Sequence, residues 1–127
     1  DTLDREVETL LIPVKGKPFI VFHDSYQYFE TRYGVVASGS ITVNPEAPPG
    51  ARRVREISER IRKAQAICIF AEPQFNSKMI NTLVEGTDAR TGILDPVGAG
   101  LEPGPDLYFS LLRNLARSIH DCLSKQD

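Results

Sequence analysis

The sequence has no tryptophan, a single methionine and only two histidines. It also lacks the G-x-G-x-x-G, P-loop and G-x-S-x-G patterns, so the usual sequence evidence for nucleotide binding or serine hydrolysis is missing. No apolar run approaches the roughly 20 residues that cross a membrane. The 15 basic and 17 acidic residues nearly balance, and this gives no overall attraction to nucleic acid. We therefore expect a protein that binds no nucleic acid.

Cysteine is scarce, and its placement does not match a metal finger. Cys68 and Cys122 are the only two cysteines, and neither belongs to a C-x-x-C pair or a zinc-finger spacing. Cys68 lies in an apolar run typical of a buried strand, whereas Cys122 closes a helical pattern. Two interpretations stay open from the residues alone: two unrelated buried thiols, or a disulfide that requires an oxidising compartment.

Short apolar runs alternate with amphipathic stretches along the 127 residues. This alternation predicts a single α/β layered domain with a central, mostly parallel, four-stranded sheet flanked by helices. Apolar residues at helical spacing predict the helices, and short apolar or β-branched runs predict the strands. The expected helices are 3–11, 24–33, 51–64, a helix through 75–83 that ends before Gly86, and a last helix from residue 105; the expected strands are 19–22, one within 35–43, 67–71 and 90–94.

Two polar residues follow directly on predicted strands. His23 comes after the first strand and Asp95 after the last. In open parallel sheets the carboxyl ends of the strands line the ligand crevice, so both side chains are predicted at one edge. An imidazole nitrogen and a carboxylate oxygen are ligands that zinc accepts. A hydrogen-bonded histidine and a turn-capping aspartate are the alternative interpretation of these positions.

Other polar residues give weaker evidence. Zinc usually takes at least three protein ligands, and the second histidine, His120, is interpreted as a solvated residue of the last helix. Glu72, Glu46 and Asp24 each carry an oxygen, but their spacing does not demand a metal. Residues 51–64 hold five arginines and a lysine against two glutamates, which is typical of a solvated helix face.

Several ordered motifs together resemble one known family. They are FIVFHDSYQYF at 19–29, TVNPE at 42–46, PGA at 49–51, FAEPQF at 70–75 and GILDPVG at 92–98. In this order, and across about residues 15–122, they are similar to the C-terminal lobe of the periplasmic zinc-binding proteins that serve bacterial zinc ABC importers.

The resemblance implies a receptor of two α/β lobes that holds zinc between them. It implies that His23 ligates the metal and that Asp95 lies at the metal site. It also implies a Cys68–Cys122 disulfide and therefore a periplasmic location. The family's preceding lobe, with its further histidine ligands, has no counterpart in these residues, so we expect 1–127 to be the C-terminal half alone.

The function that the resemblance implies is high-affinity zinc uptake, with no catalytic activity. Zinc, the missing N-terminal lobe and a membrane permease are the expected partners, with residues 97–104 and the arginine-rich helix as candidate permease-docking surfaces. An isolated lobe would also leave apolar surface uncovered where the other lobe packs, and self-association of the fragment is a further candidate interaction that the sequence does not decide. The alternatives are a manganese-type receptor lobe and a stand-alone, small, metal-dependent α/β enzyme, whose chemistry would need a third convergent group.

Overall fold

The computed structural model describes residues 2–22, 27–35, 37–41, 46–47, 49–95, 104 and 106–124. Its elements alternate helix and strand as the sequence predicts. The helices are α1 (Thr2–Leu11), the 3-10 turn η1 (Ile12–Val14), α2 (Gln27–Tyr33), α3 (Ala51–Ala64), α4 (Ser77–Val84) and α5 (Leu107–Ser124). The strands are β1 (Phe19–Val21), β2 (Gly39–Ser40), β3 (Cys68–Ala71) and β4 (Arg90–Ile93).

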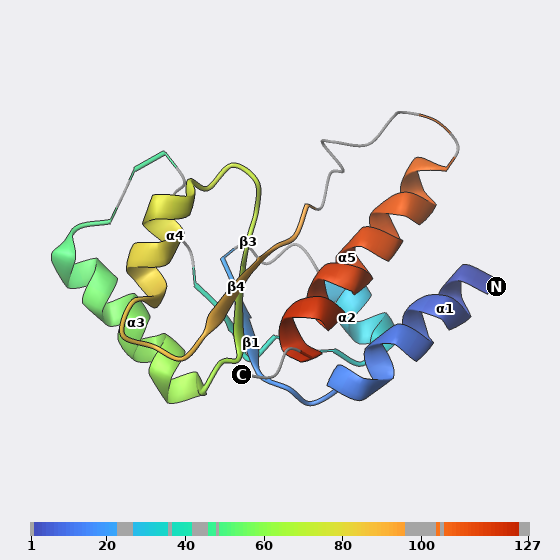
Figure 1. Cartoon of the computed structure of the whole chain (residues 1–127), viewed down its shortest axis with the longest axis horizontal. Helices are drawn as coiled ribbons and strands as arrows, with labels where there is room; N and C mark the ends of the chain where they lie inside the picture. Colours follow the sequence, from blue (N-terminus) through green and yellow to red (C-terminus); the bar gives the residue numbers. More distant parts are fainter. Residues whose placement is uncertain are drawn as a thin grey trace.

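The four strands form one sheet in the order β2-β1-β3-β4, and every neighbouring pair is parallel. The predicted mostly parallel four-stranded sheet is therefore confirmed. Parallel strands need crossover connections, and here each crossover contains a helix. Figure 1 shows the sheet between two helical layers, with α3 and α4 on one face and α1, α2 and α5 on the other.

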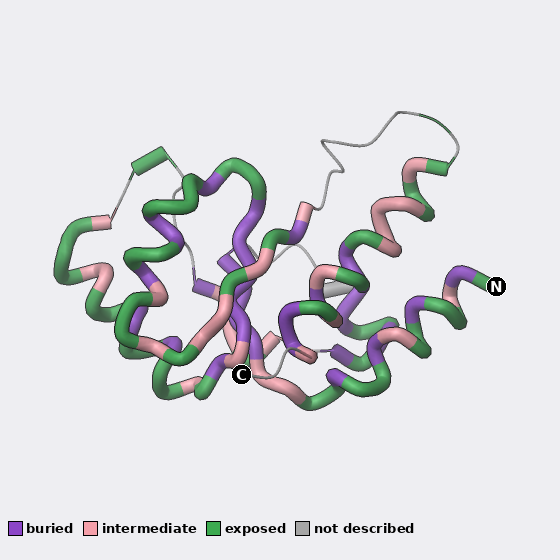
Figure 2. The backbone as a smooth tube through the Cα atoms, viewed as in Figure 1, coloured by how far each residue is buried: buried purple, intermediate pink, exposed green. Residues whose placement is uncertain are grey.

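Alternate residues of the central strands face opposite helical layers, because successive side chains of a strand point to opposite faces. Phe19, Val21 and Phe70 pack with α1, α2 and α5 in one hydrophobic core. Ile20 and Ile69 pack with α3 and α4 in a second core. Figure 2 shows the central strands buried along their length and the helices buried on their inward faces.

The bounds of α3 and α4 have local causes. Helix α3 carries its apolar residues on one stripe, with Ile57 and Ile61 buried, and ends where Gln65 adopts a left-handed conformation with φ 52°. Helix α4 begins after Asn76, whose side-chain oxygen accepts a hydrogen bond from the Met79 backbone N–H at 2.7 Å. In the described residues, no helix is both long enough and apolar enough to cross a bilayer.

Candidate metal centre

The carboxyl ends of β1, β3 and β4 lie side by side at one edge of the sheet. The Phe22 N–H donates to the Phe70 carbonyl at 3.2 Å, and the Leu94 N–H donates to the Ala71 carbonyl at 2.8 Å. These bonds continue the parallel ladders one residue beyond β1 and β4. The chain therefore leaves all three strands at the same edge.

Asp95 lies at this edge, as the sequence predicts. It comes two residues after β4, directly after the fully buried Leu94, and is itself partly buried. Burial of Leu94 fixes the backbone immediately before the carboxylate. The sequence rule for strand ends therefore placed this residue correctly.

His23 falls outside the described residues, as does Asp24. The last described residue before it is Phe22, which is buried and hydrogen-bonded to β3. The chain thus reaches position 23 from the same edge that carries Asp95. The ligand role of His23 stays a prediction.

Glu72 is a third polar residue at this edge, and it is buried. It follows β3 directly and has an exposed fraction of 4%. The Gln74 side-chain amide donates to its carboxylate at 2.8 Å. Because β3 lies between β1 and β4, a residue at its end is enclosed by the two neighbouring strand ends. In the described part of the chain, no three His, Cys, Asp or Glu residues cluster closely enough to hold a metal.

His120 lies at the opposite edge of the sheet. The Arg90 guanidinium, on the first residue of β4, donates to the Cys122 carbonyl near the end of α5 at 2.9 Å. The end of α5 is therefore held at the amino edge, away from Asp95. The His120 ring is partly exposed, with Nδ1 3.1 Å from the Asp121 carboxylate. The interpretation of His120 as a helical histidine outside the site agrees with this position.

The two cysteines form a disulfide at that amino edge. Cys68 opens β3 and Cys122 lies in the last turns of α5, with their Cα atoms 6.3 Å apart. Both are buried. The predicted Cys68–Cys122 pairing is confirmed, and it joins the centre of the sheet to the last helix.

Comparison with known proteins decides the family. The model of the ZnuA family, described as "Zinc-uptake complex component A periplasmic", matches residues 1–122. The chain belongs to the ZnuA family. This confirms the resemblance drawn from the sequence motifs and the expected periplasmic location, which suits a disulfide-bonded domain.

Curated ZnuA relatives are much longer than this chain. The high-affinity zinc uptake system protein ZnuA of Brucella suis is 61% identical over 125 residues, which are 98% of this chain and 37% of that protein. The protein of the same name from Yersinia pestis is 42% identical over 94% of this chain and 38% of its own length. These relatives are named as components of an uptake system and not as enzymes, in agreement with the prediction of no catalytic activity.

Two solved structures share the fold. A crystal structure of ZnuA matches with a TM-score of 0.68 and 26% identity, over 97% of this chain and 45% of that one. Zinc-bound AdcA from Streptococcus pneumoniae matches with a TM-score of 0.76 at 22% identity, over 98% of this chain and 28% of its own. The second likeness concerns the fold alone.

Proposed function

We propose that this chain is the C-terminal lobe of a periplasmic zinc receptor that serves a bacterial ABC importer. Membership of the ZnuA family over residues 1–122 supports the transport role. The chain spans 37% of its Brucella suis relative, which leaves room for a second lobe in the whole protein. On this proposal zinc is cargo that is captured and released unchanged.

The observation that carries the proposal is the position of Asp95 at the carboxyl edge, the same edge at which β1 ends before residue 23, with the end of β3 between them. A neutral imidazole from His23 and the Asp95 carboxylate would then be offered to the metal from the same edge, on either side of the end of β3. One nitrogen and one oxygen donor suit zinc better than a harder ion such as manganese. Because the imidazole must be deprotonated to bind, zinc affinity should fall as the pH is lowered.

Two donors are fewer than the three that zinc usually takes from a protein. The remaining donors would come from the other lobe, and zinc would hold the two lobes together. The loaded receptor would then present its metal to a membrane permease. A lobe on its own should therefore bind zinc much more weakly than the whole receptor.

Calorimetric titration of the 127-residue chain with zinc tests this assignment. We expect weak binding, with a micromolar or weaker dissociation constant, that His23→Ala abolishes and Asp95→Ala reduces. His120→Ala is the matched control, because it removes the other histidine from the opposite edge and should leave binding unchanged. If His23→Ala bound zinc as tightly as the parent, the assignment of the site would be wrong.

A growth experiment addresses the manganese alternative. Cells that lack the whole receptor are grown in medium depleted of zinc and in medium depleted of manganese. We expect the growth defect in the zinc-depleted medium, because the predicted imidazole donor favours zinc. A defect confined to the manganese-depleted medium would favour a manganese-type receptor.

A further inference from the structure

A groove opens between the first turn of α3 and helix α4. Its volume is about 300 Å³, at the lower end of the range for ligand pockets and large enough for one apolar side chain. Met79 and Leu83 are buried within it, so its floor is apolar. The residues that line it include Pro49, Val54, Lys78, Met79, Thr82 and Leu83.

The walls of the groove are held in place by hydrogen bonds. The Ser58 hydroxyl of α3 donates to the Leu83 carbonyl of α4 at 2.9 Å, and this bond is buried. The Asn76 side chain fixes the first turn of α4 through the Met79 N–H. Because both walls are tied by buried or capping bonds, the groove is preformed, and an occupant would not need to open it.

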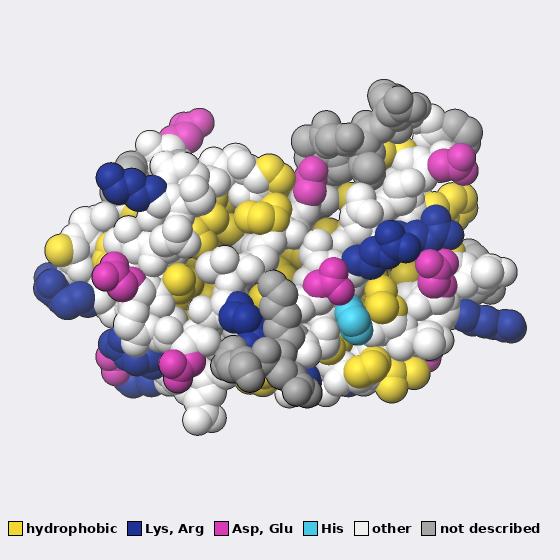
Figure 3. Space-filling view, viewed as in Figure 1, with side chains coloured by type: hydrophobic (Ala, Val, Ile, Leu, Met, Phe, Trp, Pro, Cys, Tyr) yellow, Lys and Arg dark blue, Asp and Glu magenta, His cyan; other side chains and the backbone are white. Residues whose placement is uncertain are grey.

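The two helices that form the groove are strongly basic. Six basic residues of α3 and Lys78 of α4 stand against two glutamates, so the pair carries a net charge of +5 in a chain whose net charge is −2. Neither helix has an acidic residue in its first turn, where the helix dipole favours one. Figure 3 shows hydrophobic surface interleaved with charged side chains, many of them basic, over this end of the molecule.

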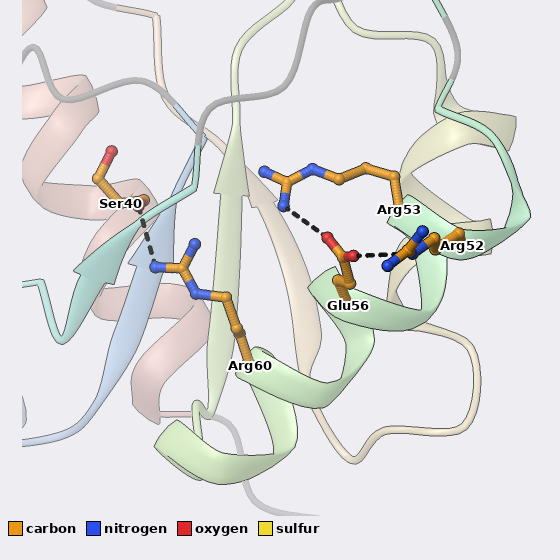
Figure 4. Close-up of polar contacts among 5 residues, drawn as sticks. All are labelled: Ser40, Arg52, Arg53, Glu56 and Arg60. Atoms are coloured by element: carbon orange, nitrogen blue, oxygen red, sulfur yellow. Dashed lines mark hydrogen bonds and ion pairs between the residues drawn. The ribbon is translucent and has the colours of Figure 1, made fainter.

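The glutamates of α3 neutralise only part of this charge. Arg52 and Arg53 both approach the carboxylate of Glu56, at 3.6 and 3.4 Å, so two guanidinium groups share one negative charge (Figure 4). The Arg52 side chain is 89% exposed, and it lies in the first turn of α3, the turn that borders the groove. The other pair, Glu59 with Arg62 at 3.0 Å, lies further along α3. By sequence, residues 51–56 hold three arginines and a single glutamate, so the end of α3 that borders the groove is basic.

The position of the groove relates it to the candidate metal centre. Helices α3 and α4 follow β2 and β3, so their first turns lie toward the carboxyl edge of the sheet, where Asp95 is found. A partner seated in the groove would thus contact the molecule on the same side as the predicted metal site.

We propose that this groove, defined by Pro49, Val54, Met79, Thr82 and Leu83, docks an acidic protein segment that inserts one apolar side chain. The basic rim attracts the segment, and the apolar floor holds its anchor residue. If the proposed function holds, the segment belongs to the permease. The assignment of the segment to the permease rests on the proposed function. The acidic character of the segment and its apolar anchor residue do not depend on it.

The shape of this surface favours a protein over an anionic membrane. Electrostatic adsorption of a basic surface to an anionic bilayer is strengthened by exposed apolar side chains that insert between the lipids. In the described residues, the large exposed hydrophobic side chains are Ile12, Ile93, Tyr108 and Phe109, and none belongs to α3 or α4. A concave apolar site with a basic rim instead complements a protruding side chain flanked by carboxylates.

The first test uses this chain and a peptide probe, and it requires neither zinc nor a permease. The amide-capped pentapeptide Glu-Glu-Leu-Glu-Glu is titrated into the ¹⁵N-labelled protein at low salt, with the peptide Glu-Glu-Ser-Glu-Glu as the matched control. We expect the leucine peptide to shift the amide signals of Val54, Met79 and Leu83 and to bind at least fivefold more tightly than the serine peptide. Absence of shifts at millimolar peptide, or equal binding of the two peptides, would overturn the proposal.

Substitutions separate the apolar and the charged contributions. Thr82→Trp should fill the groove and weaken peptide binding at least tenfold, whereas Thr82→Ser should not. Lys78→Glu, at the rim, should weaken it several-fold. Lys63→Glu makes the same charge change in the last turn of α3, away from the groove, and should have less than a twofold effect. Unchanged binding by Thr82→Trp would contradict docking in the groove.

The second test uses the whole receptor with its permease in lipid nanodiscs. Thr82→Trp should raise at least tenfold the receptor concentration that half-maximally stimulates ATP hydrolysis, with zinc affinity unchanged. Unaltered stimulation would overturn the permease assignment. A lipid-binding surface would give a different result. In that case Lys78→Glu would weaken stimulation and Thr82→Trp would not, and the receptor would bind permease-free vesicles of anionic phospholipid. That outcome would overturn the proposal. If the unsubstituted receptor bound no zinc, that result would instead contradict the proposed function.

Discussion

Gly92 in β4 is a residue whose missing side chain matters for packing. A Cβ atom at this position would lie 2.7 Å from Cε1 of the Phe70 ring and 3.7 Å from the Cβ of Cys122. The first distance is shorter than carbon atoms tolerate, and the Phe70 ring is buried in the core beneath α5. The glycine therefore allows the ring and the disulfide to pack against the sheet.

Gly92→Ala should destabilise the protein, because the added methyl group forces the buried Phe70 ring to move. Overpacking of this kind costs about 1–3 kcal/mol of unfolding free energy. Urea unfolding followed by circular dichroism measures the change. Gly39→Ala is the matched control in another strand, since no atom lies within 4 Å of the place that its methyl group would take, and it should change stability by less than about 0.5 kcal/mol. Equal stability of the two variants would contradict this account of Gly92.

The sequence predicted the position of some single residues and not the burial of others. Asp95 could be placed at the carboxyl edge because a strand end is readable from the apolar run before it. The burial of Glu72 could not be predicted, because it depends on β3 lying between two other strands. Local sequence does not reveal which strands lie on either side of β3, because strand order depends on contacts between segments distant in the chain.

At the scale of elements, α3 matches its predicted bounds of 51–64. Its apolar stripe, its dense charge and the flanking proline-rich segment all give the same boundaries. Strand β2 is shorter than the apolar segment that predicted it, with only Gly39 and Ser40 paired to β1. An edge strand has one neighbour, so its length depends on how far that neighbour's register extends.

The link between β3 and α5 is the element-scale contact with the largest expected effect on stability. The Cys68–Cys122 disulfide closes a 54-residue separation, for which loop entropy gives a stabilisation of about 4 kcal/mol. We expect reduction with dithiothreitol to lower the urea concentration at the unfolding midpoint. The decrease should equal the lost unfolding free energy divided by the dependence of that free energy on urea concentration. The double variant Cys68→Ala, Cys122→Ala should show a lowered midpoint that dithiothreitol does not change further.

Alkylation checks the same bond directly. Without reductant, the mass of the unfolded protein should not change on treatment with iodoacetamide, because both thiols are in the disulfide. Two added groups in the protein purified from the periplasm would contradict the pairing.

At the scale of the whole molecule, zinc should act as a stabilising ligand. A ligand that binds only the folded state stabilises it by about 2.7 kcal/mol when its free concentration is a hundred times the dissociation constant. We expect the thermal midpoint of this chain to rise with zinc concentration in differential scanning calorimetry. The rise should disappear in His23→Ala and persist in His120→Ala. An equal rise in both variants would indicate zinc binding elsewhere.

The sequence by itself determined the succession of helices and strands, the edge on which Asp95 lies and the family to which the chain belongs. These properties depend on local periodicity, on the position of polar residues directly after apolar runs, and on short ordered motifs. Each of these signals is contained in residues that are close together in the sequence. Only the tertiary structure decided the strand order β2-β1-β3-β4, the burial of Glu72 and the groove between α3 and α4. Each of these depends on contacts between residues distant in sequence, such as the Ser58 bond to Leu83, and on which strand neighbours which. The disulfide belongs to both: motif likeness suggested the pair, and the packing of α5 on β3 brings the two sulfur atoms together.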